Sequence, residues 1–322
     1  MNEQARFGFR TPQYEQFPPV VQAALVTGVC PSHCTYCPQG SGSLRMAPLF
    51  LTFDLWRKIA TEVAAYPWAT LRIHGRGEPM SNQEYVPMIA FAKRIGVRTV
   101  TSFTNGIYLH RQVEPLLDAG IDLLEISADA ADPALYLAWR CNPFFEQVVE
   151  GVRKLFAARN RRSGCATRIV VSAVDHPDFR PHREAFTRFW GPFCDKILVR
   201  PFHTYGGLIC DLYDRQRPGD NYIPCVQLWE RFSINSEGHV NACFNDWSDA
   251  EIVGDLGEPG ASIRKIWHSD TFRRIREASL TGPCVKCCFT CSGPTLSSWG
   301  SDGYQHWVRD LLDRPGSSGG EA

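Results

Sequence analysis

The stretch from residue 28 to residue 42 reads GVCPSHCTYCPQGSG, and the interpretation of the whole chain starts there. It contains Cys30, Cys34 and Cys37, with three and then two residues between them. Three thiolates can hold three irons of a 4Fe–4S cluster, which normally takes four cysteines, so one iron stays open to another ligand. Zinc is the alternative, but structural zinc takes four ligands, and His33 lies awkwardly between two of the cysteines to be the fourth.

The composition of the chain supports a metal role for cysteine. The 322 residues include 13 cysteines, and 34 basic residues balance 34 acidic ones, which argues against a nucleic-acid binder. No apolar run approaches the roughly 18–20 residues of a membrane helix, and the first twenty residues contain no apolar signal segment. We therefore expect a cytoplasmic protein without membrane contact. Disulfides rarely persist in that reducing compartment, so metal binding is the better explanation for so many thiols.

Short apolar runs alternate with longer amphipathic runs along most of the chain. The strands are expected near residues 22–27, 70–74, 98–103, 123–128, 168–174 and 196–200. The helices are expected near residues 53–65, 83–95, 111–119, 143–159 and 182–190. This alternation implies parallel strands joined by right-handed crossovers. Six such units are too few for a closed eight-stranded barrel, so we predict an α/β fold with an open, partial (β/α)6 barrel.

Changes in pattern suggest four segments. Residues 1–20 are polar and form a lead-in, and residues 21–210 form the partial barrel. Residues 211–300 form a small α+β extension, with a hairpin over 231–234 and 239–243 and a helix over 262–278 that Ser262 caps. Residues 301–322 form a C-terminal helix and a disordered tail.

A second set of cysteines follows the barrel. It consists of Cys225, Cys243, Cys284, Cys287, Cys288 and Cys291, the last four in the sequence CVKCCFTC. In a reducing compartment this set also indicates a metal site, and zinc is a more credible occupant here than in the first loop. The other cysteines are most simply small buried residues. Cys194, just before the last predicted strand of the barrel, is kept as a candidate catalytic thiol.

The first cysteine loop resembles the radical S-adenosylmethionine (radical SAM) superfamily, because its CxxxCxxC spacing carries an aromatic residue before the last cysteine and follows the first strand of a partial barrel. In that family the open iron binds SAM, and reductive cleavage of SAM yields a 5′-deoxyadenosyl radical that abstracts hydrogen from a substrate. The resemblance covers about residues 21 to 293. It implies SAM and a 4Fe–4S cluster as cofactors, and it places Tyr36 beside the adenine.

Further motifs at the strand ends fit the same resemblance. The segment HGRGEP at residues 74–79 is similar to the family's GGEP motif, which holds the amino group of SAM. Gly77 and Glu78 are kept, whereas Arg76 replaces the first glycine. By the resemblance, the ribose and carboxylate of SAM would contact Thr104, Ser127 and Asp129. Residues of these types also favour turns, so turn formation is the alternative explanation.

The second cysteine set resembles the SPASM/twitch extension of radical SAM enzymes, which holds auxiliary iron–sulfur clusters. The resemblance implies one auxiliary 4Fe–4S cluster held by Cys225, Cys243, Cys284 and Cys287, with Cys288 and Cys291 as rivals for the last two places. A full SPASM extension carries two clusters and seven cysteines, and only six are found here. A thiol in this set that binds no iron could return a hydrogen atom, and Cys288 is the candidate for that catalytic role.

Membership of the superfamily does not determine the substrate, so three classes of function are compared. The first is dehydrogenation or epimerisation at a carbinol of a small carbohydrate-like natural product, as in aminoglycoside antibiotic biosynthesis. The second is a maturase that acts on a peptide or protein, such as a peptide epimerase or thioether former. The third is a zinc-binding interaction protein without catalysis. The expected barrel starts near residue 21, without the leader-binding domain of many peptide-modifying members, which favours the first class.

For that first class we expect two partners, a small-molecule substrate and a one-electron donor such as flavodoxin or ferredoxin. Three polar residues at or near strand ends are candidates for contact with the substrate, namely His74, Arg200 and His203. Such residues more often satisfy neighbouring backbone groups, which is the alternative reading of each.

Overall fold

The computed structural model describes residues 8–209, 224–286, 288 and 303–313, and within these ranges the chain forms a nine-stranded sheet. In their spatial order its strands are β11 (Ile252–Asp255), β10 (His239–Asn241), β9 (Arg231–Ile234), β1 (Val20–Ala23), β4 (Thr70–Ile73), β5 (Thr99–Thr104), β6 (Leu123–Ser127), β7 (Arg168–Asp175) and β8 (Lys196–Pro201). All neighbours from β9 to β8 are parallel, whereas β10 is antiparallel to β9 and β11. This is the predicted α/β class with a mostly parallel sheet.

The sheet is an open barrel wall rather than a closed barrel. Among the described strands β8 ends one side, and β1 pairs with β9 instead of with β8. Val20 lies opposite Arg231 and Ala23 opposite Ile234, so the hairpin of the C-terminal extension continues the sheet of the barrel. The hairpin predicted around residues 235–238 is confirmed, with Gly238 at a φ of 99° in its turn.

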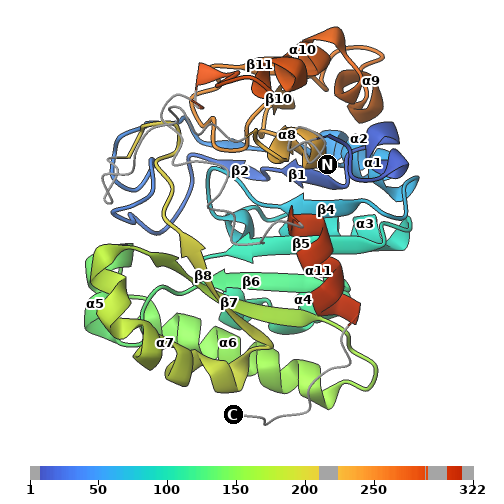
Figure 1. Cartoon of the computed structure of the whole chain (residues 1–322). Coiled ribbons are helices and arrows are strands. Elements are labelled where there is room, and N and C mark those ends of the chain that lie inside the picture. The colour runs from blue at the N-terminus through green and yellow to red at the C-terminus, as the bar shows by residue number, and fades with distance from the viewer. Residues whose placement is uncertain (1–7, 210–223, 287, 289–302, 314–322) are drawn as a thin grey trace.

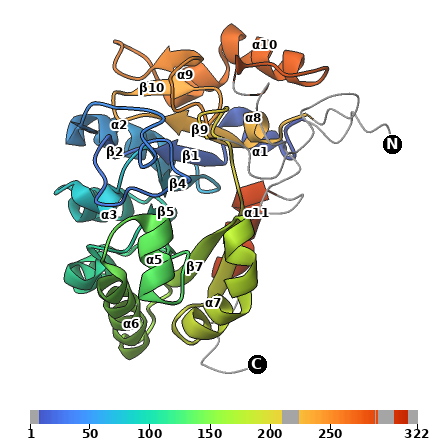
Figure 2. The same ribbon diagram turned by 90° about the vertical axis from the view of Figure 1, so that its left-hand side faces the viewer.

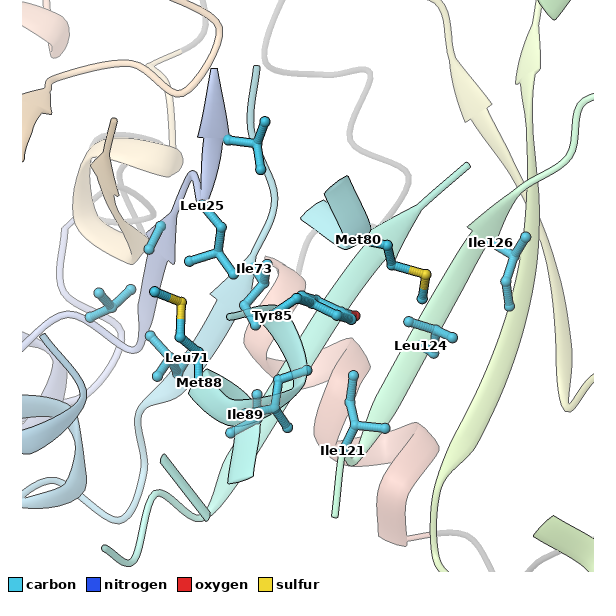
Figure 3. Close-up of a cluster of buried hydrophobic side chains, with 14 of the residues drawn as sticks. Leu25, Leu71, Ile73, Met80, Tyr85, Met88, Ile89, Ile121, Leu124 and Ile126 are labelled. Atoms are coloured by element: carbon cyan, nitrogen blue, oxygen red, sulfur yellow. The ribbon is translucent and has the colours of Figure 1, made fainter. Parts of the chain in front are cut away.

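Helices cover the outer face of this sheet (Figures 1 and 2). Those of the barrel are α2 (Phe53–Ala64), α3 (Tyr85–Arg94), α4 (Val113–Asp118), α5 (Pro133–Arg140), α6 (Phe145–Arg161) and α7 (Arg183–Trp190), with 3-10 turns η2 (Pro79–Ser81), η3 (Leu109–Arg111), η4 (Pro177–His182) and η5 (Gly191–Phe193). Figure 3 shows Leu71 and Ile73 of β4 in one core with Met88 and Ile89 of α3, and all four are fully buried. None of the described helices has the length and apolarity of a membrane span.

The inner face of the sheet is covered by a segment from the end of the chain. Helix α11 (Gly303–Asp313), red in Figure 1, crosses the parallel strands. Its Tyr304 and Val308 are fully buried in a small core with Val20 of β1 and Leu123 of β6. An open barrel leaves its inner face exposed unless another element fills it, and α11 fills the amino-terminal half.

The remaining elements differ in part from expectation. The single helix predicted over residues 262–278 is wrong: the segment forms α9 (Ile263–Trp267) and α10 (Asp270–Ser279). Ser262 caps α9 as predicted, but Ser269 also accepts a hydrogen bond from Phe272 N–H and starts a new helix. Helix α5, the hairpin of β2 (Val26–Thr27) with β3 (Leu49–Phe50), and short helices α1 (Pro12–Gln16) and α8 (Gln227–Glu230) were not expected. The predicted break near 211–221, residues 287 and 289–302, and the tail from residue 314 lie outside the described residues.

Candidate functional site

A cavity of about 260 Å³ lies at the carboxyl ends of the parallel strands, where barrel folds carry their chemistry. Both cysteine sets reach it. Cys30, Cys34 and Cys37 of the first set line it together with Cys225 and Cys243 of the second set. The cavity therefore connects the loop that follows β1 with the C-terminal extension.

The first cysteine loop is held against the barrel by hydrogen bonds. Helix α5 anchors it through His33 N–H to Arg140 O at 3.2 Å and Thr35 N–H to Trp139 O at 3.1 Å. Its sulfurs also have nitrogen donors nearby. Asn105 Nδ2 lies 3.6 Å from Cys30 Sγ, and Arg140 Nη1 lies 3.5 Å from Sγ of the buried Cys34.

These contacts fit thiolates that bind a metal. Burial raises the pKa of Cys30 to about 11 and that of Cys34 to about 12, and burial also raises the pKa of Cys37. Three buried thiols would thus stay protonated alone, whereas coordination to iron removes their protons. The N–H donors at Cys30 and Cys34 are the kind of neighbour that tunes iron–sulfur clusters. The three residues fit the three-cysteine cluster predicted from the sequence.

A single zinc ion is less compatible with the site. Zinc–sulfur bonds of about 2.3 Å bring the ligand sulfurs within roughly 4 Å of one another. Within the described ranges, no three His, Cys, Asp or Glu side chains converge on a point where one metal ion could be held. A four-iron cluster spreads its cysteine ligands further apart, so the arrangement favours the cluster.

Glu78 joins the ends of β4 and β5 through its buried carboxylate. Its Oε1 accepts hydrogen bonds from Thr104 Oγ1 at 2.6 Å and Met80 N–H at 3.0 Å. Its Oε2 accepts from Asn105 N–H at 2.7 Å, and burial raises its pKa. The hydroxyl of Thr104 also accepts from Gly106 N–H at 3.0 Å. Both Glu78 and Thr104 line the cavity as predicted, and Thr104 orients Glu78.

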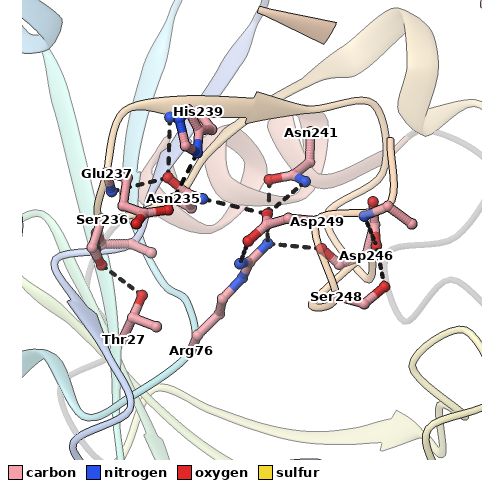
Figure 4. A network of polar contacts seen from close by, with 12 residues as sticks. Thr27, Arg76, Asn235, Ser236, Glu237, His239, Asn241, Asp246, Ser248 and Asp249 are labelled. Atoms are coloured by element: carbon pink, nitrogen blue, oxygen red, sulfur yellow. Dashed lines mark hydrogen bonds and ion pairs between the residues drawn. The ribbon is translucent and has the colours of Figure 1, made fainter. Parts of the chain in front are cut away.

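Gly77 and Arg76 of the HGRGEP segment occupy their positions for different structural reasons. A Cβ at Gly77 would lie 2.7 Å from Val29 O, so only glycine fits beneath the cysteine loop. Arg76 points instead toward the C-terminal extension (Figure 4), where its guanidinium binds Asp249 at 2.5 and 2.6 Å and Asp246 O at 2.7 Å. Burial opposes ionisation of Asp249, but the bonds and charge of Arg76 lower its pKa below the ordinary value. Arg76, which departs from the GGEP pattern, thus links the barrel to the C-terminal extension.

The carboxylate of Asp129 has three partners, of which one is the backbone N–H of Val174, 2.7 Å from Oδ1. Arg140 forms a buried ion pair with the carboxylate at 2.5 Å, and Tyr36 donates its hydroxyl proton to it. Arg140 also donates to the carbonyl of Ser127, and the ring of Tyr36 stacks on His176 at 5.6 Å. Tyr36, Ser127 and Asp129 all line the cavity, as expected for residues near SAM.

The structure brings four cysteines of the second set together. Cys284 Sγ lies 3.9 Å from Cys288 Sγ, and the pKa of Cys284 is raised, first by that contact, then by burial and by the nearby thiols of Cys288, Cys225 and Cys243. These four match the number of ligands of a 4Fe–4S cluster. Cys287 and Cys291 lie outside the described residues, so their places are not compared.

Cys194 lies away from the cavity, contrary to the expectation of a catalytic role. It precedes β8, so it sits at the amino end of that strand, whereas the cavity lies at the carboxyl ends. Its thiol contacts Trp190 O at 3.4 Å, and burial raises its pKa to about 12. This is the behaviour of a small half-buried core residue.

Comparisons with known proteins agree with this geometry. The profile of the Radical SAM superfamily matches residues 25–178, and that of the iron-sulfur cluster-binding SPASM domain matches residues 225–292. GTP 3′,8-cyclase of Edwardsiella ictaluri is 31% identical to the chain, with 76% of this chain and 82% of that one covered. The chain belongs to the radical SAM superfamily. SAM, the SAM-binding 4Fe–4S cluster and auxiliary iron–sulfur binding in the SPASM domain follow from that membership.

Other similarities of this radical SAM protein are more limited. GTP 3′,8-cyclase of Mannheimia succiniciproducens is 30% identical over 41% of this chain and 39% of its own length. The solved structure of BtrN with AdoMet and 2-DOIA is similar with a TM-score of 0.57 at 16% identity, covering 87% of this chain and 97% of that one. SuiB of Streptococcus suis with precursor peptide SuiA gives a TM-score of 0.64 at 12% identity, covering 88% and 72%. These two structures share the fold.

The sequence reasoning missed two residues of the radical SAM site, Arg140 and Asn105. Asn105 precedes Gly106, and this pair of residues is typical of a turn, yet the amide of Asn105 reaches Cys30. Arg140 lies at the end of α5, which was not predicted. A signal for α5 was present, because Asp132 caps the helix from just before Pro133, a common way for a helix to begin.

Proposed function

We propose that this radical SAM protein abstracts a hydrogen atom from a carbinol of a small, carbohydrate-like molecule bound between the two cysteine sets. The observation that carries the proposal is the cavity, which Cys34 and Cys37 line together with Cys225 and Cys243. Its volume suits part of a small ligand, and its lining includes polar groups such as His203 that could bind hydroxyls. The likeness to BtrN supports the fold of such an enzyme.

The roles proposed for the chain's own residues follow from their contacts. When bound, the cluster at the first loop reduces SAM, and the 5′-deoxyadenosyl radical that results takes the hydrogen atom. Glu78 is proposed to accept hydrogen bonds from the SAM amino group, because its carboxylate is fixed by Thr104 and by two backbone N–H groups. Arg140 is proposed to hold the first loop and to orient Asp129 beside Tyr36.

We favour dehydrogenation over epimerisation as the outcome. Epimerisation needs a thiol that binds no iron and can return hydrogen to the substrate. Among the described residues, every cysteine that lines the cavity belongs to one of the two sets, and the 3.9 Å separation of Cys288 Sγ from Cys284 Sγ supports a ligand role for Cys288. An auxiliary cluster held by the second set would accept the second electron, with flavodoxin or ferredoxin as the proposed donor to the first cluster.

The test is an anaerobic assay of the reconstituted enzyme with SAM and dithionite. Sugar phosphates, sugar acids, aminocyclitols and amino sugars deuterated at one carbinol carbon are supplied, and 5′-deoxyadenosine is analysed by mass spectrometry. Deuterium in 5′-deoxyadenosine together with a ketone product, at one SAM per turnover, supports the proposal. Inversion with solvent deuterium at that carbon would instead show epimerisation, and turnover of peptides alone would contradict the small-molecule class. The Cys30→Ala variant serves as the inactive control.

A second candidate is cyclisation of a purine nucleotide, as the name of the similar GTP 3′,8-cyclases indicates. The observation that favours it is the 31% identity to GTP 3′,8-cyclase over 82% of that relative. The same assay with GTP decides between the two candidates, because consumption of GTP with SAM cleavage would support cyclisation and its absence would leave the first candidate.

A further inference from the structure

The inner face of the barrel sheet carries charged side chains in its middle layer. Successive residues of a strand point to opposite faces, so Arg72 of β4 and His74, directly after β4, point inward while Leu71 and Ile73 point into the outer core. Arg200 of β8 and Arg231 of β9 line the same cavity as Arg72 and His74. Interiors of such barrels are normally apolar, so this concentration of cations calls for a reason.

Two cations that line the cavity already have carboxylate partners. Arg200 Nε donates to Glu125 Oε1 at 2.6 Å, and a second guanidinium nitrogen binds the other oxygen of that buried carboxylate. Arg140 is paired with Asp129. Arg231 of β9 takes part in neither pair, and Glu230 beside it is the carboxylate that attracts it most strongly.

Arg231 is the cation that most clearly has hydrogen-bond donors without an acceptor. It is 3% exposed, and within the described part of the chain its Nε and Nη2 have no hydrogen-bond partner. Its guanidinium lies over the ring of Phe244 at 4.4 Å, and this stacking leaves the N–H groups at the edge of the guanidinium plane able to donate hydrogen bonds. Glu230 is the carboxylate nearest in the chain, but its Oε1 accepts from Gln305 N–H at 2.9 Å, and the residue does not line the cavity.

His74, which lines the same cavity, adds a ring nitrogen that has no hydrogen-bond partner. Its Nδ1 has no partner among the described residues, and its ring packs edge-on against Phe103 at 4.6 Å. Burial and the charges of Arg72, Arg200 and Arg231 lower its pKa well below the ordinary value, so the imidazole is neutral beside three guanidinium groups. Buried polar atoms without partners destabilise the folded protein, and a bound group that supplies those partners would remove this cost.

We propose that the cavity contains an oxyanion subsite, in which Arg231 and His74 bind a phosphate or carboxylate group of the substrate. The inference rests on the proposed function and narrows the substrate to an anionic one, for example a sugar phosphate or a sugar acid. Guanidinium groups match the oxygens of phosphate and carboxylate with paired hydrogen bonds, and a cavity away from bulk water strengthens the attraction. Arg72, stacked between Phe103 at 4.2 Å and Tyr304 at 4.3 Å, supplies further positive charge from the floor of the subsite.

The test is anion binding to the anaerobic, cluster-loaded enzyme by calorimetry, without any turnover. Inorganic phosphate, acetate and the uncharged polyol myo-inositol are the probes. We expect binding of phosphate or acetate and at least a tenfold weaker affinity in Arg231→Gln, with a smaller loss in Arg231→Lys and His74→Gln. Tighter phosphate binding indicates a phosphorylated substrate, and tighter acetate binding indicates a carboxylate. The matched control is Arg188→Gln, because Arg188 is an exposed arginine on α7 that pairs with Glu184.

The results that overturn the subsite are equally defined. Absence of binding by both anions, binding of myo-inositol alone, or equal affinity in Arg231→Gln would each contradict it. If Arg231→Gln does not retain its iron and circular dichroism spectrum, His74→Gln and Arg231→Lys decide by the same criterion. Anion binding that depends on Arg231, in an enzyme that processes no carbohydrate, would support the subsite and refute the proposed function alone.

Discussion

Arg140 Nη1 lies 3.5 Å from Cys34 Sγ, although 106 residues separate them in the chain. The same guanidinium forms the buried ion pair with Asp129. One side chain therefore connects the first cysteine loop with the end of β6. Because a cation and an N–H donor close to a cluster sulfur stabilise the reduced, more negative cluster, Arg140 is expected to set its potential.

Replacing Arg140 by Gln should make the midpoint potential of the SAM-binding cluster more negative. It should also destabilise the protein by roughly 3–5 kcal/mol, because Asp129 is left buried without its partner. The double variant Arg140→Gln/Asp129→Asn should recover most of the stability but not the potential. A redox titration followed by electron paramagnetic resonance measures the first effect, and an unchanged potential would refute the role given to Arg140.

Iron content distinguishes a ligand from a hydrogen donor at Cys288. We expect about eight irons in the enzyme, for two 4Fe–4S clusters. Cys288→Ser should lose up to about four of them, whereas Cys194→Ser, which changes a thiol outside the cavity, should keep all. Anaerobic iron and sulfide analysis measures the difference. Full iron in Cys288→Ser would restore the hydrogen-donor role predicted from the sequence.

The tie between Arg76 and Asp249 should contribute to stability. Arg76→Gly restores the family's glycine pair but removes the guanidinium that neutralises Asp249 and binds Asp246 O. We expect a loss of about 2–3 kcal/mol, less than for a fully buried pair because Asp249 is partly exposed. Urea unfolding of the holoenzyme measures it, with Arg57→Gly in the exposed pair with Asp54 as the control. Equal losses in both variants would contradict a special role for the tie.

The packing of α11 on the inner face can be tested through one hydrogen bond. Tyr304 Oη and Thr101 Oγ1 lie 2.9 Å apart, and both residues are fully buried. Tyr304→Phe should cost about 1–2 kcal/mol, since Thr101 loses a partner, and lower the Tm by roughly 2–4 °C. Tyr304→Phe/Thr101→Val removes both polar groups and should be closer to the wild type. The pairing would be contradicted if the double variant lost more free energy of unfolding than the two single variants lose together.

His74 should make the stability of the protein depend on pH. Its pKa in the folded state is depressed below the ordinary value of 6.5, chiefly by burial. The unfolded chain then binds a proton that the folded protein does not, so stability present above pH 6.5 is lost as the pH falls. At pH 5.5 the loss is roughly 1 kcal/mol relative to pH 7.5.

The measurement is urea unfolding at several pH values in the wild type and in His74→Gln. The variant should lack this part of the acid dependence, whereas His268→Gln, which changes an exposed imidazole, should retain it. Identical pH profiles for the wild type and His74→Gln would contradict the depressed pKa.

Much of the fold follows from short-range features of the sequence. Strand β5 is rich in β-branched residues, strand β7 contains the apolar run Ile169–Val171, and helix α6 repeats apolar residues on one face, so local pattern suffices to locate them. The three cysteines after β1 and the segment around Glu78 were also recognisable, because their chemistry depends on spacing within one loop. The split between α9 and α10 was missed because the amphipathic pattern runs on past Ser269, whose capping bond is a matter of backbone geometry.

The sequence by itself therefore determined the class of fold and the radical SAM family, and it predicts the three cysteines that would hold the first cluster. Only the tertiary structure decided that Arg140 reaches Cys34, that Cys284 and Cys288 lie together, and that Arg231 faces the same cavity as His74. The physical reason is the distance along the sequence between the residues that interact. A motif consists of neighbouring residues, whereas the pairing of β9 with β1 depends on the register of a sheet that joins segments far apart in the chain.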